Sequence, residues 1–345
     1  MIDLKNHICK LPFTYMEVGQ TDVFPCCPNW LQKSITKTED VGNAWDSDSL
    51  KDIQQTILDG SYKYCSVENC PPLSKLVNTG KVDLNYFTTP TEFKKMDTTH
   101  PTTISFGYDK SCNLSCPSCR LNIEMADGAE LERVNRITDI IIKRYGENLE
   151  GLYISPTADP FVSKSFRRLI STINKTSFPK LKYIHLHTNG ILFNEKTWKQ
   201  LPALKRFLKA IEISVDAATK ETYVDVRRGG DWDVLIENLK FISTLKINEI
   251  IISMVVSDSN FMEMESFYNM MNDIFKGRAK IFFKKINNWG TYSDSEFLQK
   301  NVCSETHPMF NLFLLQLSKI NYKDNCIHNM HDIITKWIPK QNKLI

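Results

Sequence analysis

The sequence predicts an α/β protein whose strands run parallel. From residue 103 onward, short apolar runs of strand length alternate with amphipathic stretches of helix length. Such alternation is typical of parallel strands joined by crossover helices. Polar residues follow several of the apolar runs, and functional residues of such folds gather where the strands end. The periodicity alone leaves open whether the strands form a barrel or a doubly wound sheet.

The first hundred residues carry a group of cysteines of their own. Residues 9–19 and 23–27 predict a hairpin, and the spacing of Leu50, Ile53 and Ile57 predicts a helix over 48–58. So short a segment has little core, and we expect a metal centre to cross-link it. We expect a module over residues 1–75, followed by a polar linker over 76–102. The cysteines of the module are Cys9, Cys26, Cys27, Cys65 and Cys70.

The remaining elements follow from the same periodicity. Candidate strands are 103–108, 151–155, 181–187, 210–215, 249–256 and 279–286, and candidate helices lie near 127–146, 162–175, 195–209, 231–245 and 260–275. Residues 291–345 predict a helical extension, with helices at 309–320 and 327–338. That extension contains Cys303 and Cys326, and a buried free cysteine is the usual case.

Composition narrows the class of protein. The 345 residues are 42% hydrophobic and 24% charged, which is typical of a globular protein with a sizeable core. A net charge of +3 argues against nucleic acid as a partner. The chain has no apolar run of 18 residues and no signal-peptide core near its start, so we expect a cytoplasmic protein without a membrane partner. Its ten cysteines then favour metal or redox chemistry over disulfides.

Three cysteines are concentrated in one loop directly after the apolar run 104–108. Cys112, Cys116 and Cys119 have the spacing C-x3-C-x2-C, which lets three sulfurs converge on one centre. Thiolates suit iron–sulfur clusters and zinc. A structural zinc ion takes four protein ligands, whereas three thiolates on a cubic cluster leave one iron open. The alternative is a zinc site whose fourth ligand lies elsewhere in the chain.

This loop resembles the signature of the radical S-adenosylmethionine (SAM) enzymes. The resemblance implies a partial (β/α)6 TIM-like barrel over residues 103–290, a [4Fe–4S] cluster on the three cysteines, and SAM bound at the open iron. In that family an external one-electron reductant, flavodoxin- or ferredoxin-like, drives SAM cleavage to a 5′-deoxyadenosyl radical that abstracts hydrogen from a substrate. The family usually has an aromatic residue where this chain has Ser118, so Tyr108 or Phe106 is expected beside the adenine.

The resemblance also assigns SAM contacts after the second and third strands. Residues 155–161 occupy the place of the family's Gly-Gly-Glu-Pro motif, which gives Thr157 and Asp159 to SAM. Asp159 has an alternative role as the cap of a helix over 161–170. After the third strand, Thr188 and Asn189 offer polar groups, and Gly190 permits the sharp turn. The preceding His185 and His187 share one strand face and are expected to be structural.

The fourth strand adds a further pair of candidates. Ser214 and Asp216 match a Ser-x-Asp pattern that lines the ribose and methionine region in the family. The arginine that follows Tyr223 can pair with the SAM carboxylate, because a guanidinium grips a carboxylate with two hydrogen bonds. We assign that role to Arg227, with Arg228 as the alternative.

The N-terminal cysteines resemble the auxiliary-cluster region called SPASM, or its shorter twitch form. The matching pieces include the turn at Gly19, the Cys26-Cys27 pair, residues 41–45 and the two cysteines at 65 and 70. This module normally follows the barrel, and its full seven-cysteine pattern is absent here. The resemblance therefore implies one auxiliary [4Fe–4S] cluster, with Cys27 as the alternative to Cys26 and zinc as the alternative metal. Its implied ligands are Cys9, Cys26, Cys65 and Cys70.

Of all aspects of the function, the sequence determines the substrate least. The resemblance, which covers about residues 9–72 and 103–290, favours a peptide or protein residue that is epimerised, oxidised or cross-linked. A sugar or small metabolite is the alternative. Cys303 or Cys326 could return hydrogen to a substrate radical, or one of them could complete the auxiliary cluster. A non-enzymatic zinc- or cluster-binding interaction module is a rival hypothesis, against which the balanced charge and the polar strand ends argue.

Overall fold

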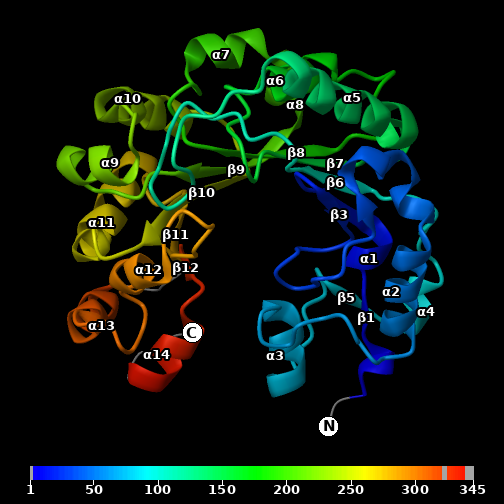
Figure 1. Ribbon diagram of the computed structural model, residues 1–345, viewed down its shortest axis with the longest axis horizontal. Helices are drawn as coiled ribbons and strands as arrows, with labels where there is room; N and C mark the ends of the chain where they lie inside the picture. Colours follow the sequence, from blue (N-terminus) through cyan, green and yellow to red (C-terminus); the bar gives the residue numbers. More distant parts are fainter. Residues whose placement is uncertain (1–2, 321–324, 339–345) are drawn as a thin grey trace. The chain divides into compact units, whose positions relative to one another are not determined.

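The computed structural model describes residues 3–320 and 325–338, which fall into two compact units. Unit 1 comprises residues up to 110 together with 126–158 and 164–184. Unit 2 comprises residues 111–125, 159–163 and those from 185 onward. Figure 1 labels the elements of both units. Within the described residues, no helix has the length and apolar character that crossing a bilayer would require.

The strands of unit 1 join the cysteine-rich segment to the later α/β repeats. Their order in the sheet is β7 (Gly151–Ile154), β6 (Thr103–Phe106), β2 (Tyr15–Val18), β3 (Asp22–Phe24) and β4 (Thr36–Lys37). β6 pairs in parallel with both β7 and β2, whereas β3 is antiparallel to both of its neighbours, β2 and β4. The expected hairpin is therefore β2–β3, and the sheet runs across the expected boundary between residues 75 and 103.

The expected linker also contains regular structure. β5 (Phe87–Thr88) pairs antiparallel with β1 (Ile8–Cys9), and Phe87 is buried. The N-terminal segment has a hydrophobic core of its own, which corrects the expectation that a metal centre must replace one. Cys9, Cys65 and Cys70 pack against this core, whose buried members are Ile8, Phe13, Ile57, Tyr62, Leu73, Leu76 and Phe87.

The helices of unit 1 include the one predicted over 48–58, which is α2 (Asp48–Leu58). It begins where the Ser47 side chain accepts a hydrogen bond from the Leu50 backbone N–H, and it buries Leu50, Ile53 and Ile57. The other helices are η1 (Leu4–Asn6), α1 (Leu11–Thr14), η2 (Thr38–Asp46), α3 (Pro71–Thr79), α4 (Pro90–Phe93), α5 (Gly128–Tyr145), η3 (Gly146–Asn148) and α6 (Lys164–Thr172).

Unit 2 continues the parallel pattern. Its strands follow the order β8 (Tyr183–Thr188), β9 (Leu208–Ser214), β10 (Glu249–Val256), β11 (Lys280–Lys285) and β12 (Cys326–His328), and β8 begins in unit 1. β9 to β12 pair in parallel. All six predicted strands from residue 103 onward are present as β6 to β11, which confirms a mixed α/β fold with parallel strands.

Two predicted helices of unit 2 are wrong in part. The helix expected over 195–209 is split into α7 (Glu195–Gln200) and α8 (Pro202–Phe207), because Pro202 lacks the N–H that would continue α7. The helix expected over 327–338 starts only at α14 (His331–Trp337), since Ile327 pairs with β11 as part of β12. The remaining helices are α9 (Lys220–Val226), α10 (Trp232–Ser243), η4 (Phe261–Glu263), α11 (Met264–Phe275), α12 (Asp294–Lys300) and α13 (Phe310–Lys319).

Candidate active site

The loop that carries Cys112, Cys116 and Cys119 is folded by its own backbone. The Cys112 N–H donates to the Glu124 carbonyl at 2.8 Å, which closes the base of the loop. The Cys119 N–H donates to the Cys116 carbonyl at 2.9 Å, which makes a tight turn. Arg228 braces the outside, because its guanidinium donates to the carbonyl oxygens of Ser115 and Leu121.

Each of the three sulfurs accepts a hydrogen bond from a nitrogen at 3.6 Å. Cys112 accepts from Asn189 Nδ2, Cys116 from Arg227 Nη1, and Cys119 from Arg120 Nη2. Burial raises the pKa of both Cys112 and Cys116, and neighbouring guanidinium groups oppose that effect. Donors aimed at sulfur stabilise thiolates, which is the form that binds metal. The residues present therefore fit an anionic thiolate centre.

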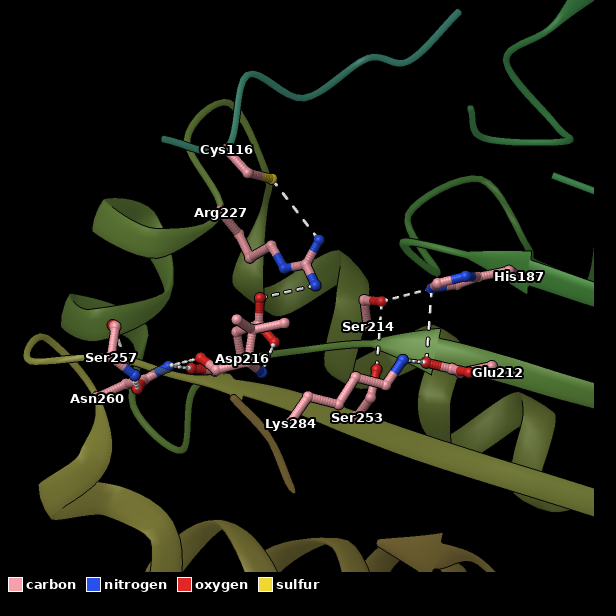
Figure 2. Close-up of polar contacts among 11 residues, drawn as sticks. Cys116, His187, Glu212, Ser214, Asp216, Arg227, Ser253, Ser257, Asn260 and Lys284 are labelled. Carbon is pink, nitrogen blue, oxygen red and sulfur yellow. Dashed lines mark hydrogen bonds and ion pairs between the residues drawn. The ribbon is translucent and has the colours of Figure 1, made fainter. Parts of the chain in front are cut away.

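Arg227 is held at this centre by a buried ion pair. Its Nη2 lies 2.8 Å from Asp216 Oδ2, and both side chains are nearly inaccessible (Figure 2). Asp216 is fixed in turn by the Val255 N–H, which donates to Oδ1 at 2.7 Å, and by Asn260 Nδ2, which donates to its carbonyl. Arg227 Nε is buried and has no hydrogen-bond partner among the described residues. One donor at the site is thus left for a ligand.

Asp159 connects its own segment to the end of β8. Its Oδ2 accepts from Thr188 Oγ1 at 2.7 Å and from the Asn189 N–H at 2.9 Å, and its Oδ1 accepts from the Phe161 N–H. The chain's own donors thus engage both carboxylate oxygens. Asn189 then reaches Asn113 and Cys112 through Nδ2. Gly190 follows with φ of 80°, the left-handed turn expected there.

A polar network lies at the C-terminal end of β9. Ser214 Oγ is 2.8 Å from His187 Nε2 and 3.3 Å from Ser253 Oγ. Glu212, two residues earlier on the same strand face, pairs with Lys284 of β11 (Figure 2). Sequence reasoning missed Glu212 and Lys284. The signal for Glu212 was its place between two isoleucines of β9, whereas Lys284 stands next to Lys285 at the end of β11 and had no comparable signal.

Tyr108 and Thr157 belong to unit 1 and have local partners there. Tyr108 is fully buried, its hydroxyl lies 2.6 Å from Thr138 Oγ1, and its ring packs edge-on against Phe166. Thr157 Oγ1 donates to the backbone carbonyl oxygens of Gly107 and Asp109. Phe106, the other guess for the adenine, is also fully buried. Contact of these residues with SAM stays a prediction.

A second group of thiols lies in unit 1. Cys9, Cys26, Cys65 and Cys70 line one cavity, and Cys27 is absent from its lining. The cavity wall is completed by Leu11, Pro12, Trp30, Leu31, Tyr62, Pro72, Leu73, Tyr86 and Phe87.

Cys26 is buried, and the other three cavity thiols are half-buried. Burial raises the pKa of Cys9 and of Cys65 to about 12. Tyr62 fixes the position of Cys9, because its hydroxyl accepts from the Cys9 N–H at 3.0 Å and donates to the His7 carbonyl. In the described parts of the chain, no three His, Cys, Asp or Glu side chains lie close enough together, as they stand, to hold one metal ion.

Cys303 and Cys326 are both in unit 2. Cys303 is buried, and Cys326 lies on β12 opposite Ile281 of β11. Burial raises the pKa of each thiol to about 12. Both are therefore protonated at neutral pH, which is the form that can give up a hydrogen atom. A role in such a step stays a prediction.

Comparison with known proteins places this geometry in context. Residues 110–271, which include the three loop cysteines, match the family model described as the Radical SAM superfamily. GTP 3′,8-cyclase of Alkaliphilus oremlandii strain OhILAs is 28% identical over 166 residues, 47% of this chain and 50% of the relative. GTP 3′,8-cyclase of Petrotoga mobilis strain DSM 10674 / SJ95 is 29% identical over 167 residues, which are 47% of this chain and 49% of the relative. The chain spans about half the length of these curated relatives.

Solved structures give more distant similarities. Streptococcus suis SuiB is 13% identical with a TM-score of 0.46, over 89% of this chain and 69% of that chain. A radical SAM methyltransferase from Sphaerobacter thermophilus is 13% identical with a TM-score of 0.39, over 64% of this chain and 63% of that chain.

Proposed function

We propose that this chain is an enzyme of the radical SAM superfamily, and on that premise we assign the residues that carry its chemistry. The family implies SAM and a [4Fe–4S] cluster as cofactors, and it needs a reductant and a substrate. We propose that Cys112, Cys116 and Cys119 hold the cluster, which when bound supplies the electron that cleaves SAM to a 5′-deoxyadenosyl radical able to abstract hydrogen from substrate. We place the strands in a partial (β/α)6 barrel and the protein in the cytoplasm.

The observation that carries the proposal is the set of N–H donors on the three sulfurs. A donor for each sulfur, two of them guanidinium groups, is suited to thiolates that share negative charge with a cluster. A thiol that binds no metal gains less from such donors, because its protonated sulfur carries no negative charge for them to stabilise. The pattern thus supports a metal-binding role for this loop.

The remaining residues of the site are proposed to bind and orient SAM. Arg227 has one unused donor, Nε, which is available to a carboxylate. Thr188 and Asn189 are held beside the loop by Asp159, which acts as a positioning residue in this proposal. Ser214 and Asp216 lie on β9 and just after it, where they offer a hydroxyl and a carboxylate to the ribose and methionine region.

Replacement of the three loop cysteines tests this proposal. The Cys112→Ala/Cys116→Ala/Cys119→Ala variant loses every protein ligand of the cluster, so we expect no 5′-deoxyadenosine release with SAM and dithionite. Ser118→Ala is the matched control, because it changes the same loop without removing a thiol. Undiminished release by the triple variant would overturn the proposal.

We further propose that Cys9, Cys26, Cys65 and Cys70 bind an auxiliary [4Fe–4S] cluster. Their shared cavity supports this, because thiols with raised pKa values lose their protons readily only to a metal centre. The absence of Cys27 from the lining favours Cys26 as the fourth ligand. Metal analysis of the anaerobically reconstituted protein decides the metal. About eight irons per chain supports two cubic clusters by ligand counting, whereas about four irons with one zinc would assign this cavity to zinc.

For the substrate we propose a peptide or protein residue, with epimerisation, oxidation or cross-linking as the outcome. The support is the resemblance of the N-terminal cysteines to the SPASM and twitch modules. A small metabolite is the second candidate, favoured by the similarity of this chain to GTP 3′,8-cyclases over about half their length. Stimulation of 5′-deoxyadenosine release by added peptide or by GTP separates the two.

A further inference from the structure

A charged cluster lies on the strand face of unit 2 that also carries Ser214. Lys284 Nζ of β11 donates to Glu212 Oε1 of β9, and His187 Nε2 of β8 lies 3.7 Å from the same oxygen. Figure 2 shows the three side chains converging from separate strands. None of them belongs to the set proposed to hold the cluster or SAM.

The cluster faces accessible space. Ile211, Ile213 and Phe283, its neighbours along β9 and β11, are fully buried. By contrast, 13% of the Glu212 side chain, 24% of Lys284 and 33% of His187 remain exposed. Because successive side chains of a strand point to opposite faces, the cluster lies on the face away from these apolar residues, and solvent still reaches the cluster on that face.

Stability does not explain the cluster. A largely desolvated ion pair contributes little relative to apolar residues of similar size, since desolvation offsets its attraction. Charged groups kept at such a position are candidates for ligand binding.

The charges of the cluster balance. Burial alone would raise the pKa of Glu212, but His187 and Lys284 lower it to about 2. Burial lowers the pKa of His187 to about 4, so the ring is neutral at neutral pH. Glu212 would repel an anionic group placed against the cluster. Among the described residues the only other contact of Lys284 Nζ is the Phe282 ring, so two of its three N–H donors stay available.

We propose that Glu212 and Lys284 form a substrate subsite for an amide edge, in which an N–H donor lies beside a C=O acceptor. Lys284 and Glu212 are in contact, so a hydrogen-bond donor lies directly beside an acceptor. This pair is complementary to the N–H and C=O groups of such an edge. The N–H donates to Glu212 and the C=O accepts from Lys284. The inference rests on the proposed function, because the bound group belongs to the substrate of that reaction. An Asn or Gln carboxamide and the lactam edge of guanine both supply this chemistry.

Matched pairs of probes test the subsite on the reconstituted enzyme with SAM bound. By calorimetry we compare acetyl-Gln methylamide with acetyl-Glu methylamide, and GTP with the triphosphate of purine riboside, whose base has no N–H donor. The first member of each pair has the amide edge and the second lacks it. We expect at least tenfold tighter binding of the first member in one pair, and the pair that shows it identifies the source. If neither pair discriminates, the proposal is wrong.

Variants show whether the discrimination arises at this cluster. Glu212→Gln and Lys284→Met are each expected to reduce it to less than threefold. Lys280→Met is the control, because Lys280 forms a similar ion pair with Glu249 at the other end of β11. Discrimination that survives in Glu212→Gln and Lys284→Met overturns the proposal, provided that iron content and circular dichroism match the parent protein.

The outcome is separable from that of the proposed function. Release of 5′-deoxyadenosine by the unmodified enzyme, with dithionite and without any probe, measures SAM cleavage alone. Absence of release overturns the proposed function. Release together with no discrimination between the paired probes overturns only the amide-edge subsite.

Discussion

At the scale of single residues, the site depends on side chains that donate hydrogen bonds to the cysteine sulfurs. Arg120, Asn189 and Arg227 each give a hydrogen bond to one sulfur of the loop. Arg120 follows Cys119 directly in sequence, whereas the other two come from later segments of the chain. Asn189 and Arg227, which are distant from the loop in sequence, distinguish a reactive thiolate centre from three cysteines that are merely close together in sequence.

We predict that Arg120→Gln lowers the reduction potential of the loop cluster. Reduction adds negative charge, and a guanidinium near Cys119 stabilises the reduced form more than the oxidised form. A net contribution of about 1 kcal/mol corresponds to on the order of 40 mV for a one-electron couple. A redox titration followed by electron paramagnetic resonance measures the shift, with the exposed Arg206→Gln as the control. An unchanged potential in a protein with full iron content would contradict the role of Arg120.

Arg227→Ala is predicted to weaken SAM binding and to destabilise the fold. Loss of a charge-assisted contact costs about 1.5–3 kcal/mol of binding free energy. Loss of the ion pair also leaves Asp216 buried without its partner, at a cost of about 3–5 kcal/mol of unfolding free energy. Calorimetry with SAM and urea unfolding measure the two effects.

A second substitution separates the two effects. The double variant Asp216→Asn/Arg227→Ala removes the unpaired carboxylate, so it is expected to recover part of the stability without recovering SAM affinity. Arg228→Ala is the comparison for binding, because Arg228 braces the loop backbone. SAM affinity lost in Arg228→Ala but kept in Arg227→Ala would move the carboxylate contact to Arg228.

At the scale of elements, the apolar periodicity predicted strands better than helices. β10 runs over Glu249–Val256, the range expected from its apolar residues. Helix ends were less predictable, since Pro202 divides one expected helix. β12 was mistaken for helix because an isolated segment shows nothing of the strand edge with which it pairs. Glu212 on the polar face of β9 was visible in the sequence, but its pairing with Lys284 depends on the strand register.

That polar face predicts a stability that falls in acid. An unfolded chain protonates His187 as the pH falls through about 6.5, whereas the folded protein does so only near pH 4. Because the unfolded state binds the extra proton between these values, stability falls as the pH drops from 6.5 to 4. The loss is at most about 3 kcal/mol, reduced by the partial exposure of the ring. Urea unfolding at a series of pH values should show a smaller slope for His187→Gln, and an equal slope would contradict the assignment.

At the scale of the whole molecule, the two groups of cysteines have different surroundings. The loop of unit 2 gives each sulfur a polar donor, whereas the cavity of unit 1 surrounds its thiols mainly with apolar and aromatic side chains. The sequence was enough to predict both groups, since cysteine spacing is local. It could not predict Tyr62, which holds the Cys9 backbone from 53 residues away.

The difference between the two groups leads to the last prediction, that they bind iron independently. Cys65→Ala/Cys70→Ala removes two of the four cavity thiols, so about four of eight irons per chain should be lost. Cys27→Ala is the matched control, because Cys27 is the neighbouring thiol that does not line the cavity. Dithionite-driven SAM cleavage should persist in the double variant, since the loop of unit 2 is untouched, whereas conversion of substrate should stop.

Circular dichroism must show that unit 1 stays folded, because Cys65 and Cys70 pack against its hydrophobic core. Full iron content in the folded double variant would remove these two residues from the ligand set, and loss of iron in Cys27→Ala would add Cys27 to it.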